Sequence, residues 1–504
     1  MPGLSSLILL TLVSGPPLHE MVVTAMDTHR PVVLLELNEL TPSIMDRFIA
    51  EGRLPNFKRL RDRSEVFVTD AEERPPYLEP WIQWVTVHTG VPYSEHGVLR
   101  LSEGHKASQK RIWDLVSQAG GAVWVCGSMN CRYDPDTRGW ILPDPWSTDV
   151  VPYPDILLPY YSFVQRNVHE YTQDRVPLSK TDYLNFIRFM VANGLSATTT
   201  ASTVRQLIAE KKAGGGRWRR AFILEELQFD LFSAVYRRLK PRFSTFFLNS
   251  TAHMQHRYWR FMEPELFRVP VSEEKQREYQ SAILEGYQAM DKLVGRMLKL
   301  VGQEAVIVMA TALSQQSCLE YEETGGKRGY RAKNFSEVIN FAGITTPHRV
   351  SPVMSEQFWI HFDNISDVSQ AQKKLEALQV NGQKALTVKP DGSSIFAFCC
   401  LRHEIAPDTM LQVADSDRGI LFFELFYAME GGKSGMHHPD GMLWIRHPER
   451  THVIHSEKVG LRSIAPTILE TLDIEKPEYM KGLSLFPLAT TPVGMRDLEV
   501  QRSI

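Results

Sequence analysis

The sequence predicts an α/β fold: a doubly wound, mostly parallel sheet that is flanked by helices and carries two inserted cap segments. Pro31 to Leu37 is a run of Val and Leu that does not alternate with polar residues, and Ala122 to Cys126 is a second such run. This pattern is typical of strands buried on both faces. Two helical segments lie between them, and the order strand, helix, helix, strand favours a doubly wound sheet. Phe243 to Leu248 and Ala305 to Met309 predict two further strands.

The first helix has clear start signals. Thr41 can cap a helix, and Pro42 suits its first turn. Met45, Phe48 and Ile49 then fall on one helical face, which we expect to pack against the sheet.

Two regions interrupt the strand and helix pattern. Prolines and two helical stretches around 183–191 and 222–239 indicate a helical insertion, which either completes the core or forms a lid over a site. Strand-like runs at 358–362 and 394–399, with a helical run at 368–378 between them, indicate a small α+β insertion. The expected division is a disordered leader at 1–30, core segments at 31–150, 243–319 and 432–490, insertions at 151–242 and 320–431, and a tail at 491–504.

Composition excludes some classes of function. The chain has 504 residues, of which 43% are hydrophobic and 23% charged, and its net charge is −3. No global field therefore favours nucleic acid or an anionic membrane as a partner. The five cysteines are odd in number and lack paired metal spacing, so we expect a reduced, cytoplasmic protein. Ser5 to Ser14 is apolar, which leaves secretion as an alternative, although we favour a disordered leader. The sequence does not determine the oligomeric state.

Polar and aromatic side chains gather between Tyr77 and Gly90, in the run YLEPWIQWVTVHTG. Asn38 and Glu39 directly follow the first strand, and ligands of open α/β sheets bind beyond the carboxyl ends of the strands. Both segments are therefore candidates for one site.

These segments resemble the alkaline phosphatase superfamily, in its phosphodiesterase and nucleotide pyrophosphatase branch. The resemblance rests on the first strand, on Leu-Pro-Asn at 54–56, on Thr-Gly at 89–90 with the following Pro and His-Gly, on Gly-x-His at 435–437 and on Met-Lys-Gly at 480–482. It implies the same doubly wound fold and a phosphoryl or sulfuryl substrate. It also implies a Thr or Ser nucleophile and two zinc ions.

The chain departs from that family at most of the positions that would hold the zinc ions. Two-zinc sites need about six protein ligands, and only His256 and His437 match cleanly. We therefore expect no ordinary two-zinc mechanism, and at most one divalent metal. The other family positions carry Asn38 for the first Asp, Pro80 for the nucleophile, Ala252 for the middle Asp, and Thr311 and Ala312 for the last Asp and His.

Three interpretations remain open. In the first, new acids in the old cleft act on a phosphodiester, a phosphorylated small molecule or a glycoconjugate, and a pair of carboxylates could divide acid and base roles as in glycosidases. In the second, catalysis is lost and the fold binds a ligand or partner. In the third, a divergent metal site uses Asn38 or Glu39 with His253, His256 and His437 or His438. The expected catalytic residues are Glu79, His256, His437 and Asn38, and the expected substrate-binding residues are Glu39, Trp81, Gln83, Trp84, His88, Arg257 and His438.

Overall fold

The structure is a computed structural model of the chain, and it describes residues 30–486 apart from 148, 171–177, 214–215, 325, 354–355 and 430–432. The expected tail and nearly all of the expected leader lie outside this described part. No helix within it is both long enough and apolar enough to cross a membrane.

The core is a nine-stranded sheet with the order β20-β2-β19-β6-β1-β5-β3-β4, in which β21 also pairs with β2. Only β19 runs antiparallel to its neighbours β2 and β6, so the prediction of a doubly wound, mostly parallel sheet is confirmed. The strands are β1 (Val32–Leu37), β2 (Glu65–Asp70), β3 (Val123–Cys126), β4 (Gly139–Leu142), β5 (Phe243–Leu248), β6 (Val306–Ala310), β19 (Asp440–Arg446), β20 (Val453–Ile454) and β21 (Val459–Gly460).

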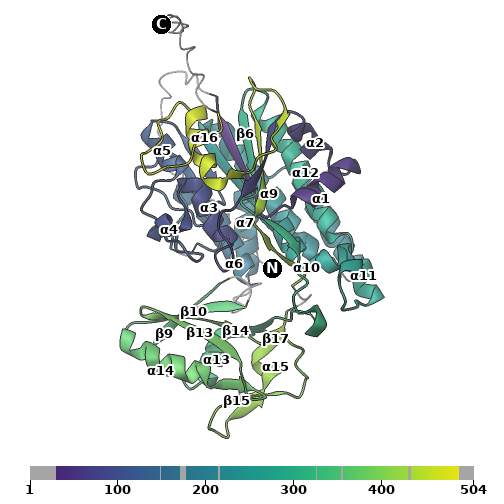
Figure 1. Cartoon of the computed structure of the whole chain (residues 1–504), viewed down its shortest axis with the longest axis vertical. Helices are drawn as coiled ribbons and strands as arrows, with labels where there is room; N and C mark the ends of the chain where they lie inside the picture. Colours follow the sequence, from purple (N-terminus) through teal and green to yellow (C-terminus); the bar gives the residue numbers. More distant parts are fainter. Residues whose placement is uncertain are drawn as a thin grey trace, which may run out of the picture.

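Helices cover both faces of this sheet (Figure 1). Successive strand residues point to opposite faces, so Val33 and Leu35 of β1 pack in one apolar cluster and Val32 and Leu34 in the other. The first cluster includes side chains of α1 (Pro42–Ala50), α2 (Pro55–Arg61), α9 (Arg220–Leu239), α10 (Ser250–Met262) and α12 (Ala282–Val301). The second includes side chains of α3 (Pro80–Thr89), α5 (Ile112–Gln118) and α16 (Ile464–Thr471).

The first insertion is helical, with α6 (Leu158–Glu170), α7 (Lys180–Ala192) and α8 (Ala197–Ala213) before α9. Leu231, Phe232 and Val235 of α9 are fully or almost fully buried in the first cluster. This helix therefore completes the core, as one of the two interpretations of the insertion expects.

The second insertion forms a lobe below the main body (Figure 1) with its own apolar cluster between Tyr330 and Phe426. Arg100 of the main body contacts it through an ion pair with Asp391 at 2.6 Å and lies over the Trp359 ring at 4.4 Å. The expected strands and helix are present, but the lobe is larger than a strand-helix-strand unit. Its strands and helices are β8 (Tyr330–Ala332), α13 (Phe335–Phe341), β9 (His348–Pro352), β10 (Gln357–Phe362), α14 (Ile365–Glu376), β11 (Leu378–Val380), β12 (Gln383–Lys384), β13 (Leu386–Asp391), β14 (Ser394–Cys399), β15 (Met410–Val413), β16 (Gly419–Leu421), α15 (Phe422–Leu425) and β17 (Phe426–Ala428).

Candidate metal centre

The candidate site lies at the carboxyl edge of the central sheet. Glu39 follows β1, and His256 is in α10, the helix after β5. His437 belongs to β18 (Gly435–His438), which pairs with β7 (Ser314–Ser317) just beyond β6. Glu79 precedes α3 at its N-cap position. The fold therefore brings together four segments that are far apart in the chain.

Glu39 is the centre of the cluster. Its side chain is 3% exposed, and its Oε2 atom lies 3.0 Å from Nε2 of His256 and 3.4 Å from Nε2 of His437. Gln315 donates to the same oxygen from Nε2 at 2.6 Å, and Asn38 donates to Oε1 from Nδ2 at 2.7 Å. The carboxylate is thus held in one orientation from both sides.

The backbone of Glu39 is fixed as firmly as its side chain. Its φ of 60° is uncommon for a residue other than glycine. Its N–H donates to the Thr311 carbonyl at 3.2 Å, and its carbonyl accepts from Nε2 of Gln255 at 2.7 Å. Left-handed residues of this kind persist where the surroundings enforce them, and they concentrate at functional sites.

The two imidazoles have the same tautomer. Nδ1 of His256 donates to the Gly435 carbonyl at 3.0 Å, and Nδ1 of His437 donates to the Leu78 carbonyl at 2.8 Å. A carbonyl can only accept, so both Nδ1 atoms carry the proton and each neutral ring has a lone pair on Nε2. These two lone pairs face the Glu39 oxygen, and the three atoms lie within 4.8 Å of one another. An anionic oxygen and two lone pairs repel one another at these distances, so a proton or a metal ion must lie between them.

Electrostatics place the proton on His437 when no other cation is present. Burial opposes charge on this ring, but Glu39 and Glu79 raise its pKa above the ordinary value. Burial lowers the pKa of His256, against the pull of Glu39. Burial would raise the pKa of Glu39, but His437 and His256 hold it well below its usual range.

Glu79 is the most exposed acid next to the cluster and contacts His437. Its side chain is 32% exposed, and Oε2 lies 3.4 Å from Nδ1 of His437. Burial raises the pKa of Glu79, while His437 and Lys433 act in the opposite direction. Glu79 thus contacts His437 without belonging to the three-atom cluster.

These residues fit a divalent metal. Two imidazole nitrogens and one carboxylate are the ligand set of many catalytic zinc sites, which leave a coordination position open. Ligating histidines almost always donate their other N–H to a carbonyl or carboxylate, as His256 and His437 do here. Within the described residues, no other group of three His, Cys, Asp or Glu side chains has this geometry.

Asn38 does not have the expected catalytic or metal-binding role. Its side chain is fully buried. Its Oδ1 accepts from Nε1 of Trp84 at 2.8 Å, and its Nδ2 donates both to Glu39 and to Oδ1 of Asn249 at 2.7 Å. These bonds make Asn38 a positioning residue for Glu39, and the ligand is the next residue in the chain.

Three of the expected substrate-binding residues are also corrected. Gln83, Trp84 and His88 are fully buried inside α3, where no substrate can reach them. His88 Nε2 lies 2.7 Å from Oε1 of Glu36, which is also buried. Trp81 is half-buried and donates from Nε1 to the Leu99 carbonyl at 2.9 Å, so it packs at the edge of the second cluster.

The remaining candidates lie around the cluster. His253 is exposed on α10 and is not part of the three-atom group. His438 follows His437 on β18 and therefore points to the opposite face of the strand, where its Nδ1 accepts from the Asp440 N–H at 3.2 Å. His438 is thus corrected as a substrate contact at this site. Arg257 is partly exposed, and its role in binding stays a prediction.

Sequence reasoning missed Gln315 and two lysines. Lys327 and Lys433 stand where the chain enters and leaves the second insertion, and the Lys433 N–H donates to the Lys327 carbonyl at 3.2 Å. Both lie close enough to Glu79 to act on its pKa. Lys433 is two residues before the Gly-x-His motif, which was the one available signal.

In its fold, this chain is similar to several solved structures. No family profile matches the sequence, and no match was found among curated proteins. Phosphonoacetate hydrolase from Sinorhizobium meliloti 1021, solved with phosphonoformate, is 12% identical at a TM-score of 0.40, over 88% of this chain and 96% of that one. A variant of alkaline phosphatase PafA is 12% identical at 0.43, over 90% and 98%. Murine ectonucleotide pyrophosphatase/phosphodiesterase 5 is 10% identical at 0.39, over 89% and 96%.

Proposed function

We propose that this chain is a hydrolase that uses one divalent metal ion to cleave a phosphodiester or a phosphorylated small molecule. The ion would be held by Glu39, His256 and His437. One observation carries the proposal: three electron-pair donors converge within 4.8 Å, while the other nitrogen of each imidazole is committed to a carbonyl.

The chain's own residues suit hydrolysis by water. A divalent ion held by Glu39, His256 and His437 would supply Lewis acidity. Glu79 takes a proton from the attacking water as the new P–O bond forms. The bond to the leaving oxygen then breaks with its electron pair. That oxygen lies on the far side of phosphorus and takes a proton from solvent, to which Glu79 returns its own. Pro80, at the position of the family's nucleophile, has no attacking group, so water fits better than a covalent intermediate.

An anionic substrate is favoured by the charges around the candidate metal centre. Lys433 acts electrostatically on Glu79, His256 and His437, and Lys327 acts on Glu79. No ion pair involves either lysine among the residues that the structure describes. Lys327 lies over the Tyr321 ring at 5.3 Å, and neither lysine is neutralised by a described carboxylate, so both positive charges favour a phosphoryl group. Variants Lys327→Gln and Lys433→Gln should raise KM. Because both lysines oppose the rise that burial causes in the pKa of Glu79, the acid limb of the kcat profile should also move to higher pH in these variants.

The carboxylate-pair interpretation has less support. Glu39 and Glu79 could act as the two acids of a glycosidase. However, the His437 ring lies between them, 3.4 Å from a carboxylate oxygen on each side. A sugar cannot occupy the same space, so a glycoconjugate is the weaker substrate class.

Metal binding provides the first test. Equilibrium dialysis against Zn²⁺ and Mn²⁺ should give about one ion per chain, and His256→Ala or His437→Ala should reduce this far below one. His438→Ala is the matched control because it removes an adjacent imidazole on the opposite strand face. Equal loss of metal in the control, or no metal in the wild type, would refute the metal centre, provided that thermal melts show all variants folded.

Turnover provides the second test. Nitrophenyl phosphodiesters, phosphomonoesters and glycosides would be compared with metal-loaded wild type and with Glu79→Gln. Loss of a general base or acid costs roughly 10²- to 10⁴-fold in rate, and the metal content of Glu79→Gln should not change. A protein that binds one ion but turns over none of these compounds would instead support the binding-module interpretation.

A further inference from the structure

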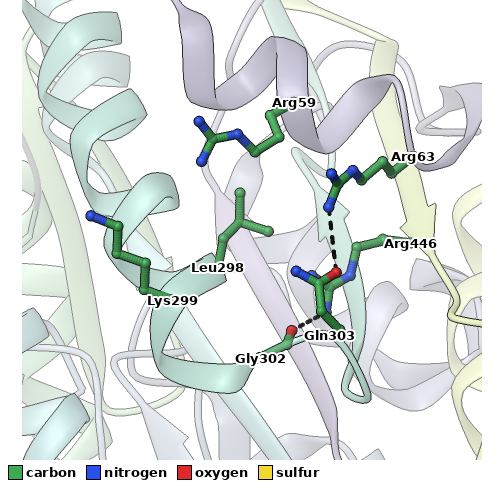
Figure 2. Close-up of a pocket in the computed structure, with 7 residues that line it drawn as sticks. All are labelled: Arg59, Arg63, Leu298, Lys299, Gly302, Gln303 and Arg446. Atoms are coloured by element: carbon green, nitrogen blue, oxygen red, sulfur yellow. Dashed lines mark hydrogen bonds between the residues drawn. The ribbon is translucent and has the colours of Figure 1, made fainter.

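A cationic hollow lies around Arg446, the last residue of β19 (Figure 2). Its cavity volume is about 230 Å³. Three arginines and one lysine line it, and no acid does. The lining residues are Arg59, Arg63, Leu298, Lys299, Gly302, Gln303 and Arg446.

Arg446 is the buried member of this group. Its side chain ends β19 and is 4% exposed. Nη2 donates to the carbonyls of Gly302 at 2.9 Å and Ala305 at 2.6 Å, but Nε is buried and has no partner among the described residues. Burial lowers the pKa of Arg446, and the nearby Arg63 lowers it further. No described carboxylate lies within ion-pair distance of this guanidinium.

The other three cations are also short of acids. Arg63 donates from Nη1 to Oε1 of Gln303 at 3.3 Å, and no ion pair involves Arg59, Arg63 or Lys299 in the described part of the chain. Arg59 is close enough to Asp291 to act on its pKa. The two carboxylate oxygens of Asp291, however, already accept hydrogen bonds from Asn56 and from the Phe57 N–H.

Helix ends account for part of this charge but not all of it. Arg59 lies in the last turn of α2, and Lys299 in the last turn of α12. Cations are favoured there because each helix end carries roughly half a negative charge. Two ends offset roughly one positive charge, whereas four cations line the hollow. The excess favours an anionic ligand.

The hollow is separate from the candidate metal centre. β19 begins at Asp440, three residues after His437, and ends at Arg446. The two sites are thus at opposite ends of one strand. An adjacent hollow of about 390 Å³ shares Arg59 and Lys299 and is also lined by Lys292, Arg296 and one acid, Glu226. The cations outnumber the acid, so a ligand longer than a single phosphate has room to extend into it.

We propose that this hollow binds a small multivalent oxyanion of the di- or triphosphate type. Arg59 and Arg63 would provide planar, bidentate contacts to phosphate oxygens, which arginine favours. Lys299 would add a point charge, and Arg446 would provide a fixed positive floor. This binding site is independent of the reaction proposed for the metal centre.

Calorimetric titration with pyrophosphate tests the proposal. We expect one site in the wild type, and an affinity about tenfold weaker in each of Arg59→Gln and Arg63→Gln, as the loss of one charged hydrogen bond implies. Both residues are exposed, so these variants should fold. Arg53→Gln is the matched control because it removes an exposed arginine that does not line the hollow.

The titration is repeated with His437→Ala, because pyrophosphate could also bind at the metal centre. Binding that survives in His437→Ala and weakens in the Arg59 and Arg63 variants supports the hollow as the site. Binding that is lost in His437→Ala and unchanged in the arginine variants overturns the proposal, as does the absence of any binding. Equal weakening in Arg53→Gln would show a nonspecific charge effect and would also overturn it.

Discussion

Glu225 is a buried acid that should make the stability of this protein depend on pH. It lies on α9 and is 6% exposed. Its Oε1 accepts from the Ser250 N–H at 2.8 Å, and Oε2 has no partner among the described residues. The side chain of the N-cap residue Asn249 does not cap α10, since it accepts a hydrogen bond from Asn38. The Glu225 carboxylate caps the amino end of the helix in its place.

The expected magnitude follows from the pKa of Glu225. Burial raises it from 4.5 to about 7, against the Ser250 contacts and with a smaller upward contribution from Glu226. At about 1.36 kcal/mol per pKa unit, this rise corresponds to about 3 kcal/mol. The folded-state pKa is the higher one, so this stabilisation is fully present below pH 4.5. It is lost as the pH rises through about 7.

Glu225→Gln should remove this pH dependence. The amide keeps an oxygen for the Ser250 N–H but cannot ionise. Guanidinium unfolding should show the variant close to wild type at pH 4.5, and more stable by about 3 kcal/mol at pH 8. Glu274→Gln, which changes an exposed acid of α11 (Glu273–Tyr279), is the control and should change little. A stability difference between Glu225→Gln and wild type that is the same at both pH values would refute the reasoning.

Two further substitutions test how the metal centre is held. Asn38→Asp introduces the aspartate that the alkaline phosphatase superfamily has at this position. The change removes the hydrogen-bond donor to Glu39 and places two carboxylates side by side. It should destabilise the fold by about 1–3 kcal/mol in thermal melts, and a gain of a second bound ion would contradict this view. In Gly435→Ala, the new Cβ would lie 2.4 Å from the Gln255 carbonyl oxygen, so β18 must move from α10. Overpacking of this kind costs about 1–3 kcal/mol, and dialysis should show weaker metal binding. Unchanged affinity would count against a rigid site.

Sequence patterns predicted the strands well because the central strands are buried on both faces. Only uniform apolar runs satisfy that burial, and such runs are visible in the sequence without knowledge of the partners. The same strands predicted that a site would form at the carboxyl edge of the sheet, because Asn38 and Glu39 come directly after the first strand. His256 and His437 were found by resemblance, and the structure places both beside Glu39.

The orientation of α3 could not be predicted. An exposed helix shows an apolar and a polar face, but nearly every residue of α3 is buried. The sequence of α3 therefore shows no separate apolar and polar faces. Without them, a polar residue in the core cannot be distinguished from one that lines a cleft. Gln83 and His88 were misassigned for this reason, and the buried partner of His88 is Glu36, 52 residues earlier.

The sequence by itself determined the doubly wound sheet and the edge at which a site could form, because burial and strand order leave local patterns. Two of the three candidate ligands, His256 and His437, came from the resemblance of their motifs to a known family. Only the tertiary structure decided that Glu39 and not Asn38 faces the imidazoles. That choice depends on Trp84, Asn249 and Gln315, which reach the two residues from distant segments. Hydrogen bonds between distant segments leave no local pattern, and the four cations of the hollow around Arg446 likewise come together only when α2, α12 and β19 pack.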